Sequence, residues 1–252
     1  MQSTVPIAVR RGGYRIANGV EIYPGGAAHI VDENALVVAD MHLGVEASLE
    51  SEGLSVPRVQ TKKILQYMDQ IIERVRPETV VVAGDLKHNF NRNLIEEWQE
   101  VTKFVEQLAG RTELECIKGN HDNFLNLILR EHGVPPVKKE LIYEDVQIVH
   151  GHVAVERRGL TIIGHIHPSL RLRDSVGASI KDHCYLWDPV KRILVLPALS
   201  LLASGVDVVS GEDADTISPY FAEGGLSGCY PILFSKDEPL KFPSVGELRQ
   251  SA

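Results

Sequence analysis

Seven of the ten histidines in this chain of 252 residues fall in short polar clusters with aspartate, asparagine and glycine. None of the three cysteines belongs to these clusters. Imidazole nitrogens combined with carboxylate and amide oxygens suit Mn²⁺, Fe or Zn²⁺ better than Mg²⁺ or Ca²⁺, which prefer sites made of oxygen alone. The clusters are Asp40-Met41-His42, Gly84-Asp85-Leu86-Lys87-His88, Gly119-Asn120-His121-Asp122, His150-Gly151-His152 and Gly164-His165-Ile166-His167.

The spacing within three clusters lets two side chains point into one site. Residues i and i+2 of an extended segment lie on the same side of the chain. This spacing separates Asp40 from His42, His150 from His152 and His165 from His167. All the clusters together offer more ligands than one ion needs. We therefore expect two divalent cations, about 3.5–4 Å apart and bridged by one carboxylate.

The first three clusters each follow an apolar run that is typical of a buried strand. These runs span residues 35–39, 79–83 and, with a weaker pattern, 114–118. Helical periods between them, over 65–75 and 94–108, predict parallel strands joined by helical crossovers. Ligand sites of such sheets lie beyond the carboxyl ends of the strands, so we expect the clusters to converge on one crevice.

The second half of the chain is richer in strand patterns. Because no linker or repeat separates the halves, we expect one domain over residues 1–252, with a motif region at about 35–200 and C-terminal strands and a loop over 201–252. The segment 205–228 is predicted to be a long loop, and the end from residue 236 to be weakly ordered. The predicted strands, which form a second or mixed sheet, are 146–149, 160–163, 183–187, 192–196 and 230–234.

The composition excludes several classes of protein. With 44% hydrophobic and 24% charged residues, the chain is neither disordered nor collagen-like. Its 26 basic and 34 acidic residues give a net charge of −8, which argues against nucleic-acid binding through a generally positive surface. Three cysteines do not make a secreted disulfide scaffold. The odd and sparse cysteines lead us to expect a cytoplasmic protein, and no apolar run approaches the roughly 20 residues of a membrane span.

In their order, the clusters resemble the pattern of the calcineurin-like metallophosphoesterases, which is D-x-H, G-D, G-N-H-D/E, H and G-H-x-H. The resemblance covers roughly residues 35–200. It implies an α/β fold of four layers, in which two β-sheets pack as a sandwich flanked by α-helices. It also implies an enzyme that hydrolyses phosphoester bonds with two divalent metal ions, Mn²⁺ before Fe, Zn²⁺ or Ni²⁺.

The resemblance assigns a role to most of the cluster residues. His121 is expected to face the substrate phosphate and to protonate the leaving oxygen during in-line attack by a hydroxide bridging the metals, an effect worth about 10²–10⁴ in rate. His88 stands where the repair-nuclease branch has a histidine that supports the catalytic one. The expected ligands are Asp40, His42 and His167 for one ion, Asn120, His150 and His165 for the other, and Asp85 as the bridge.

Four further residues have two interpretations each. Arg171 and Arg173 either contact substrate phosphates or belong to a solvated charged face. Asp122 either polarises His121 or caps the helix predicted over 124–131. His152 either lines the site or is a polar residue of its strand.

Several substrates are compatible with this pattern. His88, the two arginines and the segment after the last cluster favour a phosphodiesterase or nuclease acting on DNA or RNA. That segment, residues 194–208, looks like the small ligase- or helicase-associated phosphoesterases related to the repair nuclease. A DNA-repair helicase or ligase is therefore the expected partner. A small-molecule phosphoesterase for nucleotides or cyclic phosphodiesters is the alternative. A protein phosphatase is disfavoured by Asp122 in place of Glu, and a non-catalytic scaffold by the complete ligand set.

Overall fold

The first sheet comes from the first half of the chain. The computed structural model describes residues 13–17, 19–90, 94–173, 179–211 and 217–251. Six strands pair in the order β1-β2-β3-β4-β5-β6, antiparallel from β1 to β4 and parallel from β4 to β6. The predicted strands 35–39, 79–83 and 114–118 are confirmed as the parallel part. The six strands are β1 (Tyr14–Ala17), β2 (Val20–Tyr23), β3 (Ala27–Ile30), β4 (Ala35–Val38), β5 (Thr79–Val82) and β6 (Glu113–Cys116).

The second sheet has seven strands from the second half of the chain, in the order β16-β15-β12-β13-β9-β8-β7. A third, smaller sheet has the order β11-β10-β14. The strands of the second sheet are β7 (Leu141–Tyr143), β8 (Val146–Ile148), β9 (Leu160–Ile163), β12 (Tyr185–Asp188), β13 (Ile193–Val195), β15 (Tyr230–Ser235) and β16 (Glu238–Lys241). Those of the small sheet are β10 (Pro168–Arg173), β11 (Ser179–His183) and β14 (Val206–Asp207).

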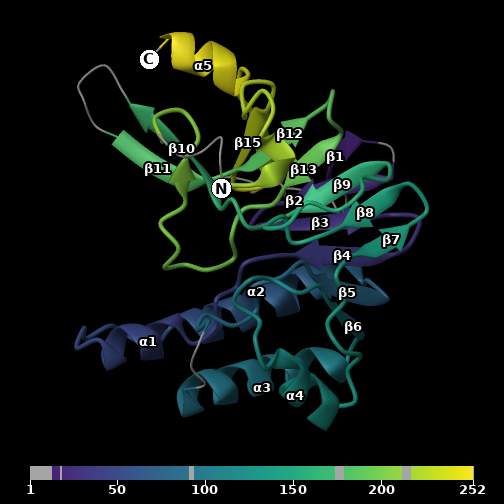
Figure 1. Cartoon of the computed structure of the whole chain (residues 1–252), viewed down its shortest axis with the longest axis vertical. Coiled ribbons are helices and arrows are strands. Elements are labelled where there is room, and N and C mark those ends of the chain that lie inside the picture. Colours follow the sequence, from purple (N-terminus) through teal and green to yellow (C-terminus); the bar gives the residue numbers. More distant parts are fainter. Residues whose placement is uncertain (1–12, 18, 91–93, 174–178, 212–216, 252) are drawn as a thin grey trace, which may run out of the picture.

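The helices lie outside the two large sheets. In Figure 1, α1 to α4 lie on one side of the strands and α5 lies at the opposite end of the molecule. The α2 and α3 helices are the crossovers that bring successive strands of the first sheet into parallel pairing. The helices are α1 (Val45–Ser51), α2 (Gln60–Val75), α3 (Ile95–Ala109), α4 (Leu125–Glu131) and α5 (Val245–Ser251), with a 3₁₀ turn, η1 (Pro219–Phe221).

Alternate residues of the central strands enter different apolar cores. Leu36 and Val38 of β4 face the helices α2, α3 and α4, whereas Ala35 and Val37 face the second sheet. This alternation follows from the two-residue period of a strand. A third core covers the far side of the second sheet with residues from β10, η1 and α5. The four-layer α/β sandwich flanked by helices is thereby confirmed.

The structure differs from the sequence expectations in the C-terminal quarter. The expected single strand 183–187 is divided at Cys184, because β11 pairs in the small sheet while β12 pairs in the large one. The expected loop 205–228 contains β14 and η1, although residues 212–216 lie outside the described part. The expected weakly ordered end instead forms β16 and α5, and Val245 of α5 is fully buried. No helix of the described chain has the length and apolarity that crossing a membrane requires.

Candidate metal centre

The five clusters meet where the parallel strands of the two large sheets end. Asp40, Asp85 and Asn120 follow β4, β5 and β6, while His150 and His165 follow β8 and β9. Backbone hydrogen bonds connect the cluster loops, such as those from Asp40 N to Gly84 O at 3.1 Å and from His42 N to Asp85 O at 3.0 Å. The structure thus brings residues more than 100 positions apart to one place, as the strand-end argument predicts.

The first group of converging side chains is Asp40, His42 and His167. Nε2 of His167 lies 3.3 Å from Oδ1 of Asp40 and 3.3 Å from Nε2 of His42. Oδ2 of Asp40 accepts a hydrogen bond from the backbone N–H of His165 at 2.9 Å. Oδ1 of this fully buried carboxylate has no hydrogen-bond donor among the described residues. A buried carboxylate oxygen without a donor, facing two imidazole nitrogens, fits a cation.

The second group is Asp85, His150 and His165, with Asn120 beside it. Nε2 of His150 lies 3.3 Å from Oδ2 of Asp85 and 3.1 Å from Oδ1 of Asn120. The other ring nitrogen, Nδ1, donates to the carbonyl oxygen of Ala83 at 2.9 Å. A carbonyl only accepts, so this bond places a proton on Nδ1 and directs Nε2 at the centre. Burial lowers the pKa of His150, but the hydrogen bond to Asp85 and the charge of Asp40 outweigh burial and raise it to about 9, so in the metal-free protein Nε2 also carries a proton, which a bound metal ion would displace.

Asp85 lies between the two groups. Its Oδ2 is 3.9 Å from Nε2 of His42 and 3.3 Å from Nε2 of His150. Burial raises the pKa of this carboxyl group, but hydrogen bonds from His150 and the backbone of His121 outweigh burial and lower it well below its usual range. Asp85 is therefore an anion in reach of both groups, which is the position a bridging ligand needs.

Burial lowers the pKa of His42 and of His165 to about 4. At neutral pH both side chains are therefore neutral imidazoles, the form that coordinates a metal. Together with the carboxylates and the amide oxygen, they make a mixed nitrogen and oxygen donor set. These donors fit divalent transition metals, and the arrangement in two groups around Asp85 fits two of them.

His121 lies beside these groups with a half-buried side chain. Its Nδ1 donates to the carbonyl oxygen of His88, and its Nε2 lies 3.9 Å from Oδ2 of Asp85. The rings of His88 and His121 are stacked, with centroids 5.8 Å apart and planes 20° apart. The contact that orients His121 is therefore made by the main chain of His88. Nε2 is left facing the centre.

Asp122 does not cap the helix that follows it. The N-terminal flanking residue of α4 is Phe124, and no side chain caps that end. The buried carboxylate of Asp122 instead accepts hydrogen bonds from the backbone N–H groups of Asp85, Gly119 and Lys87, at 2.8, 2.8 and 3.3 Å. It joins the second and third clusters, because their loops present several backbone donors to one carboxylate.

An open cleft of about 380 Å³ gives access to the centre. The loop between Ser200 and Val206 forms one wall of the cleft. The buried side chain of Gln60 on α2 holds this loop by hydrogen bonds. Oε1 of Gln60 accepts from Ser200 and from the N–H of Leu201, while Nε2 donates to Met41 O and His42 O. The histidines that line the cleft are His42, His88, His121 and His167.

The remaining candidates are placed less directly. His152 lies near the second group, with its ring 5.1 Å from that of His150 and 6.0 Å from that of His165. Arg171 on β10 donates to Asp207 at 3.3 Å and does not line the cleft. Arg173 is the last residue of β10, and its side chain lies outside the described residues. Contact of these arginines with substrate stays a prediction.

Three residues beside the site, Gln60, Lys87 and Glu97, were not predicted from the sequence. Lys87 stands inside the second cluster, and its position between Asp85 and His88 was the only local signal. Gln60 and Glu97 lie on helices, away from any cluster, and carry no such signal. All three are buried polar side chains that contact the cluster loops.

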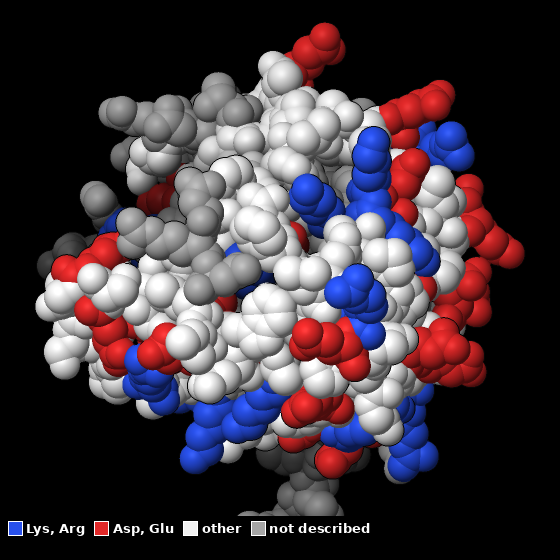
Figure 2. Space-filling view, turned by 60° about the horizontal axis from the view of Figure 1, so that its bottom comes forward, with Lys and Arg blue, Asp and Glu red and all other residues white. Residues whose placement is uncertain are grey.

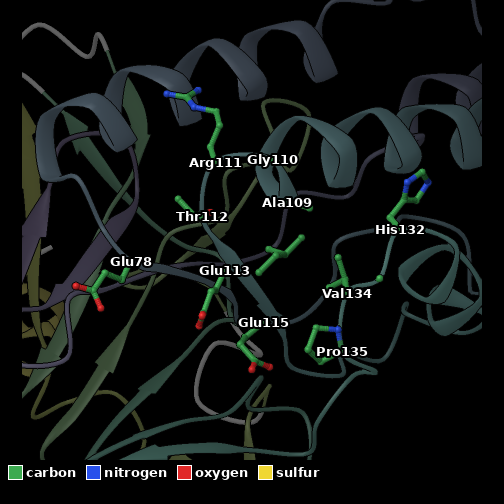
Figure 3. A pocket seen from close by; sticks show the side chains of 12 residues that line it. Glu78, Ala109, Gly110, Arg111, Thr112, Glu113, Glu115, His132, Val134 and Pro135 are labelled. Carbon is green, nitrogen blue, oxygen red and sulfur yellow. The ribbon is translucent and has the colours of Figure 1, made fainter.

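A wider depression of about 770 Å³ lies elsewhere, between β6 and the C-terminal ends of α3 and α4. Figure 3 shows Glu113 and Glu115 of β6 within it, with Arg111 and His132 nearer its other edges. None of the cluster residues lines it. Size alone therefore does not identify the site, and the convergence of the histidines and carboxylates does.

Comparison with known proteins agrees with this geometry. A family model for the calcineurin-like phosphoesterases matches residues 34–177, more than half of the chain. The fold is similar to that of the nuclease MPE of Pseudomonas putida, with a TM-score of 0.63, 18% identity, and coverage of 88% of this chain and 94% of that one. The phosphoesterase Yfce of E. coli aligns with a TM-score of 0.38 and 14% identity over 66% of this chain and 80% of that one.

No curated protein matches the sequence. The family model nevertheless matches a range that includes all five clusters, whose side chains meet in the structure. The chain therefore belongs to the calcineurin-like phosphoesterases, and it is a metal-dependent hydrolase of phosphoester bonds.

Proposed function

We propose that this protein is a phosphodiesterase that cleaves DNA or RNA strands at a centre of two divalent metal ions, with His121 as the proton donor. The observation that carries the proposal is the position of His121. Its Nδ1 donates a hydrogen bond to the carbonyl oxygen of His88, and its Nε2 faces Asp85. The side chain also lines the open cleft. A phosphoester seated on that centre would present its leaving oxygen to Nε2.

The protein supplies the ligands in two groups that share one anion. Asp40, His42 and His167 would hold one ion, Asn120, His150 and His165 the other, and Asp85 would contact both. When bound, such ions neutralise phosphate oxygens and make hydroxide available at neutral pH. The mixed nitrogen and oxygen donors would accept several divalent transition metals, and we propose Mn²⁺, with Fe, Zn²⁺ or Ni²⁺ as substitutes.

His121, protonated on both ring nitrogens, would complete the reaction by donating its Nε2 proton to the leaving alkoxide as the phosphorus–oxygen bond breaks, and it would end as the neutral Nδ1–H tautomer. General acid catalysis of this kind is worth about 10²–10⁴ in rate. The stacked ring of His88 would limit rotation of His121, while the bond from Nδ1 to the His88 carbonyl holds the tautomer that keeps Nε2 directed at the substrate.

The nucleic-acid substrate is supported by the fold similarity to a nuclease and by the open cleft. Figure 2 shows basic and acidic side chains interspersed on the face that it presents, without an extended basic surface. Because the net charge of the chain is −8, binding would depend on the centre itself and on a few nearby cations. A DNA-repair helicase or ligase as partner stays a prediction.

A small-molecule phosphoesterase is the second candidate. The cleft volume of about 380 Å³ is that of a pocket for one nucleotide. The net charge of −8 also favours a short substrate over a long polyanion. Nucleotides and cyclic phosphodiesters would meet the same ligands and the same proton donor.

A substrate panel with added Mn²⁺ separates these candidates. It contains single-stranded DNA, duplex DNA, RNA, 2′,3′-cyclic nucleotides, bis-p-nitrophenyl phosphate and p-nitrophenyl phosphate, each run beside His121→Ala. We expect cleavage of the strands and of the diester, with a loss of about 10²-fold or more in the variant on strands, where the leaving alkoxide needs a proton. Turnover of cyclic nucleotides or of the monoester without cleavage of the strands would support the second candidate, and no turnover of any substrate would contradict both.

A further inference from the structure

A buried ion pair joins the loop that carries His88 to α3. Nζ of Lys87 is 3.0 Å from Oε1 of Glu97 on α3, and the two side chains are only 4% and 2% exposed. Nζ also donates to the carbonyl oxygens of Asn89 and, at 3.3 Å, of His121. The ammonium group thus uses its three donors on three partners in different parts of the chain.

Glu97 also forms hydrogen bonds with Asn89 of the same loop. Its Oε1 accepts from the N–H of Asn89 at 3.1 Å, and its Oε2 accepts from the side-chain amide of Asn89 at 2.6 Å. Glu97 stands in the first turn of α3, where the helix dipole stabilises a negative charge. The loop from Lys87 to Asn89 is therefore fixed to the helix at both its charged and its amide groups.

Burial of two charges is costly, and such a pair is weak evidence for stability. A pair of apolar residues of similar volume would fill the space at least as well. What an apolar pair lacks is the bond to the His121 carbonyl, which ties the loop of the third cluster to the loop of the second. The contacts of Lys87 therefore indicate a role in geometry.

We propose that Lys87 and Glu97 are positioning residues for the proton donor: they hold the loop of His88 against the main chain of His121, so that Nδ1 of His121 stays bonded to the His88 carbonyl. This inference rests on the proposed role of His121. In the step concerned, the doubly protonated ring of His121 gives its Nε2 proton to the leaving oxygen as the phosphorus–oxygen bond opens, and the ring is left as the neutral Nδ1–H tautomer that the His88 carbonyl stabilises. Loss of the ion pair would let His121 turn away without removing a metal ligand.

The leaving group of the substrate reports this step selectively. An alkoxide, the leaving group of a nucleic-acid strand, needs a proton as it departs. A p-nitrophenolate is a weak base and departs without one. A variant in which His121 is misplaced therefore loses activity on the strand and keeps it on the aryl ester, whereas a variant with damaged metal ligands loses both.

The test compares Lys87→Met, the double variant K87M/E97Q and the parent with Mn²⁺ added. The double variant avoids an uncompensated buried carboxylate and so protects folding. Lys138→Met is the matched control, because Lys138 pairs with Glu115 at 2.9 Å and neither residue lines the cleft. The substrates are the dinucleotide dTpdT and bis-p-nitrophenyl phosphate, and His121→Ala gives the full effect of a missing donor.

We expect K87M/E97Q to lose about 10²-fold in kcat/KM on dTpdT and less than about fivefold on the aryl ester, with the metal content unchanged. Lys138→Met should lose less than twofold on either substrate. Equal losses on both substrates, or no loss on dTpdT, would overturn the inference.

A second readout needs no activity. In the metal-free protein, at a pH where the His121 ring is neutral, ¹H–¹⁵N correlation spectra should show the single ring proton on Nδ1, and K87M/E97Q should shift the population towards Nε2–H. An unchanged tautomer would overturn the inference. If His121→Ala itself shows no dependence on the leaving group, the proposed donor role fails instead, and the ring spectra still decide whether Lys87 and Glu97 position His121.

Discussion

Five residues of the candidate centre adopt a left-handed backbone, with φ values of 55° at Asp40, 47° at His42, 53° at Asp85, 67° at His165 and 48° at His167. Aspartate and histidine tolerate this region better than branched residues do. Such outliers persist where the surrounding structure holds them, and they gather at functional sites. The sequence indicated the chemistry of these residues but not their backbone, because φ follows from the hydrogen bonds between loops.

At the scale of the residue, replacement of Asp85 by Asn tests the shared anion. The amide keeps the shape of the side chain and removes its charge. Loss of a hydrogen bond to a metal ligand typically lowers metal affinity by roughly 10–100-fold. We expect loss of the shared anion to lower the affinity for both metal ions by more than this. Calorimetric titration with Mn²⁺ and metal analysis would measure this. Asp145→Asn, at an exposed aspartate, is the control. Two equivalents bound with parent affinity would contradict a bridging role.

At the scale of the element, the start of α1 is packed closely on α3. Gly44, which flanks the start of α1, has φ of 88°, and a Cβ placed there would lie 2.5 Å from Cβ and Cγ of Glu97. Gly53, after the end of the same helix, has φ of 89° and no atom within 4 Å of such a Cβ. The two glycines therefore share a backbone conformation and differ in what surrounds them.

Gly44→Ala and Gly53→Ala should separate these effects. Each variant loses about 1–2 kcal/mol to the left-handed conformation. Gly44→Ala should lose more than this in its free energy of unfolding in urea, since the methyl group displaces Glu97, and it should also reduce cleavage of dTpdT. Equal losses of stability in the two variants would show that Glu97 gives way at no cost.

The elements differ in how readily the sequence predicts them. The central strands β4 and β5 are buried on both faces, and their unbroken apolar runs were recognised. The β1 strand is only partly buried, and its short hairpin with β2 gains its strand conformation from pairing. The α5 helix did carry a signal, since Ser244 and Glu247 form reciprocal hydrogen bonds of the capping-box kind.

At the scale of the whole molecule, the C-terminal helix covers the second sheet. Val245 of α5 is fully buried among Val208, Phe221 and their neighbours in the third core. Val245→Ala should destabilise the protein by roughly 1.5–2.5 kcal/mol, from two lost methyl groups at about 0.8 kcal/mol each and the cavity left behind. Val190→Ala, at a valine that is 90% exposed, should change the unfolding free energy by less than about 0.5 kcal/mol. A similar result for both would mean that α5 is not docked.

The net charge sets the second prediction at this scale. A protein with 26 basic and 34 acidic residues can meet few phosphates at once. Binding of single-stranded DNA to the metal-loaded His121→Ala variant should weaken with salt along a log–log slope of about −1 to −3, which corresponds to a few displaced counterions. Fluorescence anisotropy across a range of salt concentrations gives the slope. A slope near −7 would reveal an extended basic surface and contradict the expectation.

The order and spacing of the clusters were sufficient to identify the family and the layered fold and to predict the metal ligands, because residue type and strand pattern are local properties. The partners of those residues depended on tertiary packing. Asp122 accepts hydrogen bonds from three backbone N–H groups, and Lys87 contacts Glu97 and His121. These contacts form between segments that are brought together only when the sheets and α3 pack. Buried polar groups take whichever donors and acceptors the packing presents to them, and the linear sequence does not contain that choice.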